Sequence, residues 1–154
     1  MLTTPLRRFA LVALATAAFG TPAHAQFGPP NTSTGPKLPP SGTIARDTAY
    51  ERKVLAEMKA PDGFTMTLYA GPPYAMYPTV VAPSPDGSVY VGVDLNLAQG
   101  AVKGRGRVMR FVDTDGDGRA DKYTTFVDVD SPRGVVADGR TVYVLHPPNL
   151  TAYH

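Results

Sequence analysis

An internal repeat is the feature that most narrows what this chain can fold into. The stretches YPTVVAPSPDGSVYVGV (77–93) and SPRGVVADGRTVYVLH (131–146) share the order proline, apolar run, Asp-Gly, Val-Tyr-Val. Pro78 and Pro132 are 54 positions apart, and Tyr90 and Tyr143 are 53 apart. A repeat of about 50 residues that holds four strands has the size of one propeller blade. The repeat therefore predicts a β-propeller.

Short alternating runs separated by turn residues predict that everything from Phe64 onward is β-structure. Asp86-Gly87 and Asp138-Gly139 mark tight hairpins within the two copies. The expected strands are 64–70, 79–82, 89–93, 108–112, 123–127, 134–137, 142–145 and 150–153. The fold class is therefore all-β.

The number of strands suggests an incomplete ring. A propeller closes with about four to eight blades, and residues 61–154 hold fewer than two. We therefore expect the N-terminal fragment of a longer propeller. The alternative is a small two-layer β-domain that is complete in itself.

Three segments precede the predicted propeller. Residues 1–25 read as a signal peptide, with Arg7 and Arg8, an apolar run, and the cleavage signature Ala23-His24-Ala25. The alternatives are a permanent N-terminal anchor and a twin-arginine signal. Residues 26–47 are rich in Pro, Gly, Ser and Thr and predict a disordered linker. Residues 48–60 predict a short helix.

Charge and cysteine content exclude several classes of function. The leader carries two of the 15 Lys and Arg residues and none of the 13 Asp and Glu residues, so the mature chain has no formal net charge. No basic stripe points to nucleic acid, and no membrane span is expected after signal cleavage. The chain has no cysteine, which excludes disulfides, thiolate metal sites and a haem attachment motif within it. We expect a periplasmic or secreted protein.

One motif carries chemistry, the acidic loop at residues 113–121 (DTDGDGRAD). Its carboxylates occupy positions 1, 3, 5 and 9 of a calcium loop, with glycine at position 6, and position 7 offers a backbone carbonyl. The predicted metal ligands are Asp113, Asp115, Asp117, Arg119 and Asp121. Position 12 is Thr124 rather than glutamate, and strands flank the loop, so we expect a calcium-binding hairpin rather than an EF-hand. The alternative is a solvated Asp/Gly turn without metal.

Other polar residues are weaker candidates. Gly104-Arg105-Gly106-Arg107 leads into a strand rather than a helix, so it lacks the helix N-terminus that binds phosphate. Asp94, Asn96 and His146 lie at strand ends, where loop residues with satisfied hydrogen bonds are the commoner finding. The catalytic and cofactor-binding residues are therefore unknown at this stage.

The chain from about Ala60 to His154 resembles a bacterial family of exported propellers described as membrane-bound dehydrogenase-like or PVC-type haem-binding CxxCH proteins. These are distant relatives of soluble quinoprotein sugar dehydrogenases. The resemblance rests on APDGFTMTLYAGPP (60–73), YPTVVAPSPDGSVYVGVD (77–94), GRGRVMRFVDTDGDGRADKYTTF (104–126) and SPRGVVADGRTVYVLHPPNLTAYH (131–154).

The resemblance implies a propeller of about six blades, in which strand 64–70 would complete the last blade. It also implies an oxidoreductase of sugars or other alcohols that passes electrons to an acceptor such as cytochrome c. PQQ or a c-type haem would serve a longer form, while calcium is the cofactor expected in this fragment. The alternative is a non-catalytic, calcium-stabilised propeller that binds polysaccharide or a protein partner. The fragment alone is not expected to be active.

Overall fold

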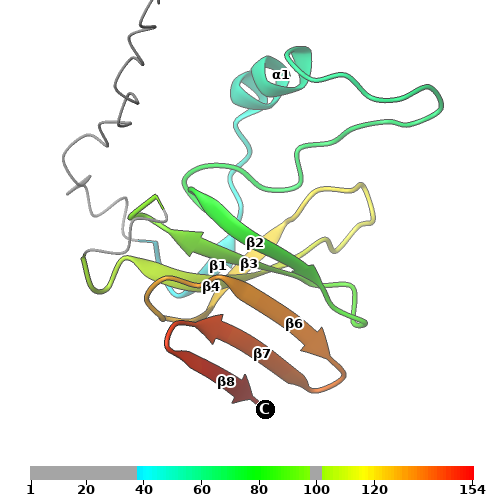
Figure 1. Cartoon of the computed structure of the whole chain (residues 1–154). Helices are drawn as coiled ribbons and strands as arrows, with labels where there is room; N and C mark the ends of the chain where they lie inside the picture. Colours follow the sequence, from blue (N-terminus) through cyan, green and yellow to red (C-terminus); the bar gives the residue numbers. More distant parts are fainter. Residues whose placement is uncertain (1–37, 98–101) are drawn as a thin grey trace, which may run out of the picture.

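The computed structural model describes residues 38–97 and 102–154, which form two antiparallel sheets and one short helix (Figure 1). The elements are β1 (Ser41–Thr43), α1 (Thr48–Ala56), β2 (Pro78–Pro83), β3 (Val89–Asp94), β4 (Gly106–Val112), β5 (Lys122–Val127), β6 (Gly134–Asp138), β7 (Thr141–His146) and β8 (Asn149–Tyr153). The expectation of mostly β-structure is confirmed. The predicted signal peptide (1–25) lies outside the described residues.

The first sheet has the strand order β1-β5-β4-β3-β2, and the second has the order β6-β7-β8. Strands β2 to β5 follow one another in sequence and pair with their neighbours, so they form a meander. These four strands are the ones expected within the first repeat. The second repeat begins with β6, and β6 contacts β2 and β3 of the first sheet.

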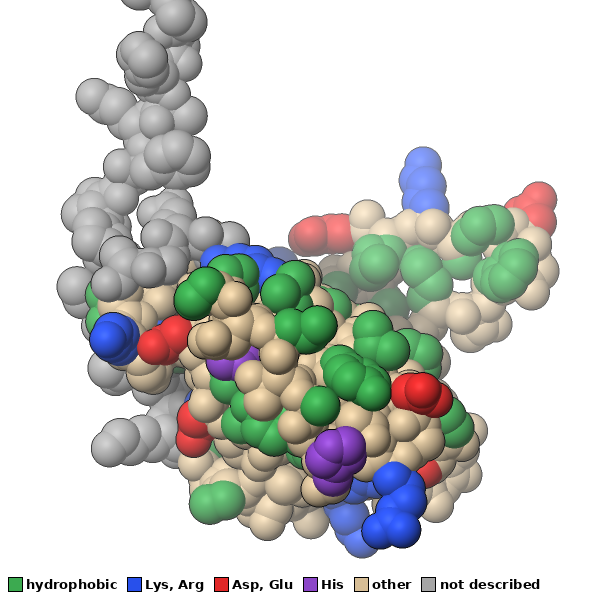
Figure 2. All heavy atoms as spheres, turned by 60° about the horizontal axis from the view of Figure 1, so that its bottom comes forward, with side chains coloured by type: hydrophobic (Ala, Val, Ile, Leu, Met, Phe, Trp, Pro, Cys, Tyr) green, Lys and Arg blue, Asp and Glu red, His purple; other side chains and the backbone are tan. Residues whose placement is uncertain are grey.

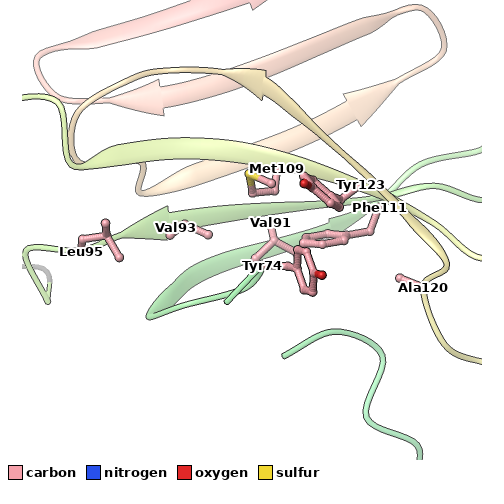
Figure 3. Close-up of a cluster of buried hydrophobic side chains, with 8 residues drawn as sticks. All are labelled: Tyr74, Val91, Val93, Leu95, Met109, Phe111, Ala120 and Tyr123. Carbon is pink, nitrogen blue, oxygen red and sulfur yellow. The ribbon is translucent and has the colours of Figure 1, made fainter. Parts of the chain in front are cut away.

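Each sheet follows the alternation seen in the sequence, because successive side chains of a strand point to opposite faces. On β3, Val91 and Val93 point to one face, and Tyr90 points to the other. The first face belongs to a core that Tyr74 and Ala120 help to close from outside the strands (Figure 3). That core contains Tyr74, Val91, Val93, Leu95, Met109, Phe111, Ala120 and Tyr123.

A second core lies between the two sheets. Its buried members come from both repeats: Ala82, Tyr90, Val108, Val129, Val135, Val142 and Val144. Phe126 of β5 packs edge-on against Tyr90 and against Tyr153 of β8, with ring centroids 5.1 and 5.6 Å apart. The sheets are therefore packed face to face by apolar side chains, as in any two-layer β-structure.

The predicted linker 26–47 is wrong in its last part. Residues 41–43 form β1, which pairs with β5 in the register Ser41↔Thr124 to Thr43↔Lys122. Ile44 donates its backbone N–H to the carbonyl of Asp121 at 2.7 Å. The Ser-Gly-Thr sequence has no apolar pattern, so this strand depends on the sheet edge that it covers.

Two further expectations differ from the structure. Residues 64–70, predicted as a strand, form no strand and run as an irregular segment past the acidic loop. The helix forms within the predicted 48–60 but ends at Ala56, and none of its residues is buried. Among the described residues, no helix is long and apolar enough to cross a membrane.

Candidate metal centre

The acidic loop is the connection between β4 and β5. Asp113 follows the last residue of β4, and the backbone N–H of Asp121 donates to the carbonyl of Val112 at 2.9 Å, which closes the base of the loop. Gly116 and Gly118 have φ angles of +78° and +79°. Residues with a side chain rarely adopt this conformation, so the two glycines allow the chain to wind tightly here.

Three of the four predicted carboxylates converge. Oxygen atoms of Asp113, Asp115 and Asp117 lie within 4.8 Å of one another. Calcium binds oxygens at about 2.3–2.6 Å, so two ligands of one ion can be about 5 Å apart. Oxygen ligands at this spacing suit a hard divalent cation, and the three residues fit calcium.

Backbone donors hold the Asp113 carboxylate in place. Its Oδ1 accepts from the N–H groups of Asp115 at 3.2 Å and Gly116 at 2.7 Å, and its Oδ2 accepts from Gly118 at 2.9 Å. Burial raises the pKa of Asp113, but these backbone hydrogen bonds outweigh it and leave the pKa below its usual value. The side chain is therefore ionised and oriented before any cation binds.

Asp121, the fourth predicted carboxylate, is not among the three that converge. Its Oδ2 accepts from the backbone N–H and the hydroxyl of Thr114, both at 2.7 Å, and its Oδ1 lies 3.3 Å from Nη2 of Arg46. The bonds from Thr114, followed by the charge of Arg46, hold the pKa of Asp121 below its usual value. The structure thus joins Asp121 to the loop by hydrogen bonds rather than to the cluster of three.

Two guanidinium groups partly neutralise the loop. Nη1 of Arg46 lies 3.0 Å from Oδ2 of Asp117, and Nη1 of Arg119 lies 3.6 Å from the same oxygen. Arg119 also binds Glu51 of α1 through Nε and Nη2, each at 2.7 Å. The sequence predicted only a carbonyl ligand from Arg119 and did not identify Arg46, which is distant in sequence and outside the motif.

The irregular segment 64–77 also contacts the loop. Thr67 donates its hydroxyl to the carbonyl of Gly118 at 2.8 Å, and Ala120 donates its N–H to the carbonyl of Tyr69 at 2.9 Å. A Cβ on Gly118 would lie 3.2 Å from Oγ1 of Thr67. The loop is therefore a junction at which Arg46, helix α1 and residues 64–77 all meet.

A small cavity of about 40 Å³ lies beside this junction, between α1 and the segment that carries Tyr69. Sites for small-molecule ligands usually have volumes of about 300–1,000 Å³. The cavity therefore has room for water and not for a sugar. The acidic loop beside the cavity offers a group of three carboxylates that could hold a metal ion.

The other sequence candidates have structural partners. Asp94 is buried, and it accepts from Nη1 of Arg133 at 2.8 Å and from the N–H of Asn96 at 2.9 Å. His146 shares a 2.9 Å hydrogen bond with the hydroxyl of Thr151. The Gly104 N–H binds the Asp130 carboxylate at 2.6 Å. These contacts account for the residues as parts of loops and strand ends.

Comparison with known families gives one match. Residues 51–154 match the domain of unknown function DUF7133. The chain belongs to the DUF7133 family. No curated protein and no solved structure matches it.

The DUF7133 region contains most of the candidate metal centre. It includes Glu51, Thr67 and all five predicted ligands, whereas Arg46 and β1 precede its first matched residue. Both sheets, apart from β1, also lie inside it. The family match therefore covers the acidic loop together with the sheet that supports it.

Proposed function

We propose that this DUF7133 protein binds one calcium ion in the loop from Asp113 to Asp121. The observation that supports the proposal is the convergence of three carboxylates within 4.8 Å on a loop wound by two glycines. Asp113, Asp115 and Asp117 would hold the ion, with the carbonyl of Arg119 and the carboxylate of Asp121 as the other expected ligands. Asp121 would have to leave Arg46 to take part.

The bound ion would have a structural role. The loop contacts the N-terminal segment through Arg46, helix α1 through the Arg119–Glu51 pair, and residues 64–77 through Thr67. A cation that orders the loop therefore stabilises the folded state as a whole. A ligand that binds only the folded state adds about 2.7 kcal/mol when present at 100 times its Kd.

Thermal unfolding of the full chain in EDTA, magnesium and calcium tests this proposal. Calcium should raise the Tm in a concentration-dependent way, and magnesium at the same concentration should raise it less, because the open loop suits the larger ion. A Tm that does not change with calcium would contradict the proposal.

We also infer that the two sheets are neighbouring blades of a β-propeller. Both repeats form antiparallel meanders, and the first strands of the two repeats, β2 and β6, contact each other. Thr79 of β2 donates its hydroxyl to the carbonyl of Pro132, just before β6, at 2.7 Å. A solved structure of a longer family member would test whether the sheets are arranged around a common axis.

The remaining predictions concern location and activity. The prediction of export rests on the signal peptide expected at residues 1–25. N-terminal sequencing of the secreted protein should find Gln26 as its first residue. Oxidation of a sugar or another alcohol, coupled to quinone or haem, remains a prediction from the family resemblance. Dye-linked oxidation assays on a longer form would test it, and binding of polysaccharide without turnover would favour the non-catalytic alternative.

A further inference from the structure

Arg107, the second residue of β4, has a guanidinium whose buried donors are unpaired. Its Nε and Nη2 atoms are buried, and neither has a hydrogen-bond partner among the residues that the structure describes. These two nitrogens carry the parallel N–H groups along one side of the guanidinium, the pair that binds both oxygens of a carboxylate. Charged donors left unpaired away from water cost free energy. The pair therefore indicates a binding position for an anion.

Other arginines of the chain show which partner this group takes. Nε and Nη2 of Arg119 both bind Oε1 of Glu51, each at 2.7 Å. Nη2 of Arg110 and Nη1 of Arg133 each lie 2.8 Å from an aspartate oxygen. Arg107 differs from these arginines, because no carboxylate oxygen binds its buried donors.

The acidic residues of the chain do not provide this partner. All 13 Asp and Glu residues of the sequence lie within the described residues. At this end of the first sheet, Asp94 binds Arg133, and Asp130 accepts from backbone N–H groups of the loop before β4. Asp128 directly follows β5 and is exposed, and it forms no ion pair with another described residue. The carboxylate for Arg107 must therefore come from another molecule.

The position of Arg107 in the sheet fixes where an anion would bind. Alternation along β4 places its side chain on the same face as Met109, and its pairing partner on β3 is Val93 of the same apolar core. The opposite face is closed here, because a Cβ on Gly106 would collide with the carbonyl of Val129. Arg107 as a whole is half-buried, so the position lies at the edge of the core. A low dielectric strengthens charge-assisted hydrogen bonds there.

The segment before β4 adds positive charge. The sequence Lys103-Gly-Arg105-Gly-Arg107 carries three cations in five residues. Although this segment lacks the helix N-terminus that binds phosphate, a guanidinium binds an anion without one. Figure 2 shows charged side chains of both signs scattered over one face of the molecule, with no continuous basic patch among the described residues on that face. This pattern favours a single small anion over a polyanion.

We propose that Arg107 binds the carboxylate of a small ligand through Nε and Nη2. One guanidinium balances one negative charge, and the two oxygens of a planar carboxylate match the two parallel N–H groups. A phosphate group carries almost two negative charges at neutral pH and would leave one of them unbalanced. The position lies at the start of β4, whereas the acidic loop follows the end of this strand. The inference therefore goes beyond calcium binding and does not depend on it.

Thermal unfolding of the full chain at pH 7 in EDTA tests the proposal, with acetate as the probe. Sodium acetate should raise the Tm in a concentration-dependent way, because it binds the folded state. Sodium chloride at the same ionic strength should raise the Tm less, since chloride cannot present two oxygens to the two N–H groups. Equal effects of acetate and chloride would overturn the proposal. A larger effect of phosphate at the same ionic strength would overturn the assignment to a carboxylate.

Substitutions of Arg107 show whether its two N–H groups carry the effect. Arg107→Lys keeps the charge but loses the parallel pair, so the Kd for acetate should rise by about tenfold or more. Arg140→Lys, at an exposed arginine between β6 and β7, is the matched control and should leave the Kd unchanged. The same Kd in Arg107→Lys and in the unaltered chain would contradict the proposal.

Arg107→Met tests the unpaired charge without any ligand. Methionine keeps much of the apolar stem and removes the guanidinium. In the absence of acetate, the Tm of Arg107→Met should equal or exceed that of the unaltered chain, because a buried charge without a partner is removed. Acetate should no longer raise the Tm of this variant. A lower Tm without acetate would show that the guanidinium already has a partner, and it would overturn the proposal.

Two further variants separate this inference from its alternatives. If acetate binds Asp128→Asn but not the unaltered chain, Asp128 itself pairs with Arg107 in solution and the proposal is wrong. Asp115→Ala combined with Asp117→Ala should leave acetate binding intact, and Arg107→Lys should leave calcium uptake intact. Each site can therefore fail without the other. Loss of acetate binding in the double variant of the acidic loop would assign the effect to that loop and contradict the proposal.

Discussion

Arg46 places its guanidinium 3.0 Å from the carboxylate of Asp117, although 71 positions separate the two residues. Arg46 follows β1, which is attached to the edge of β5, and Asp117 lies at the tip of the loop that leads into β5. The hydrogen bond to Asp117 raises the pKa of Arg46. The guanidinium of Arg46 therefore binds one of the carboxylates that we expect to bind calcium.

Removing this competing charge should strengthen calcium binding. In Arg46→Ala, Asp117 and Asp121 lose a partner that calcium must otherwise displace, so the Kd for calcium should fall by about threefold to tenfold. Calorimetry measures it directly. Arg52→Ala is the matched control, because Arg52 donates to the carbonyl of Thr48 within α1. A weaker affinity in Arg46→Ala would show that Arg46 supports the site rather than competes for it.

The acidic loop should make stability depend on pH in the absence of calcium. Asp113 and Asp121 have folded-state pKa values below the ordinary 3.8. The unfolded chain therefore takes up protons first as the pH falls. The two aspartates therefore contribute fully to the free energy of unfolding above about pH 5. This contribution is lost as the pH falls through their folded-state pKa values.

Urea unfolding in EDTA at several pH values measures this effect. In Asp121→Asn, the free energy of unfolding should fall less steeply as the pH is lowered. Asp62→Asn, in an exposed turn after α1, should leave this pH dependence unchanged. If the free energy of unfolding falls as steeply in Asp121→Asn as in the unaltered chain, the Asp121 carboxylate does not contribute to the pH dependence.

Much of the fold follows from local sequence patterns. The alternation in VYVGV predicts β3, and the two Asp-Gly pairs predict the hairpins β2–β3 and β6–β7, because these signals act over a few residues. FTMTLYA (64–70) alternates equally well but forms no strand, since its Thr67 and Tyr69 bind the acidic loop instead. Long-range partners of this kind leave no local signal.

The same distinction applies to the candidate metal centre. The spacing of Asp113, Asp115 and Asp117 predicts their convergence, because one tightly wound loop carries all three. Arg46 and Glu51 reach the loop only through the docking of β1 and α1. Their roles could not be predicted from the motif.

The core of the first sheet should be sensitive to truncation. Phe111 is 0% exposed, and Phe111→Ala should lower the free energy of unfolding by about 3–5 kcal/mol through lost burial and a cavity. Phe64→Ala removes the same atoms from a side chain that is 72% exposed, and its effect should be within about 0.5 kcal/mol. Similar losses in both variants, measured by urea unfolding, would contradict the assignment of the core.

Helix α1 should depend on its ion pair with the loop. None of its residues is buried, and Glu51 binds Arg119 at 2.7 Å. Glu51→Ala should therefore speed hydrogen exchange of the α1 amides while leaving those of β3 and β4 unchanged. Glu57→Ala, just after the helix, is the control. Equal protection of α1 in both variants would mean that other contacts hold the helix.

Calorimetric titration of the full chain with calcium tests the central claim most directly. We expect uptake of one ion, which Asp115→Ala combined with Asp117→Ala abolishes. The combination of Asp62→Ala and Asp138→Ala, at two exposed aspartates outside the loop, should leave uptake intact. Unchanged uptake when Asp115 and Asp117 are both replaced, or no uptake by the unaltered chain, would contradict a calcium site in this loop.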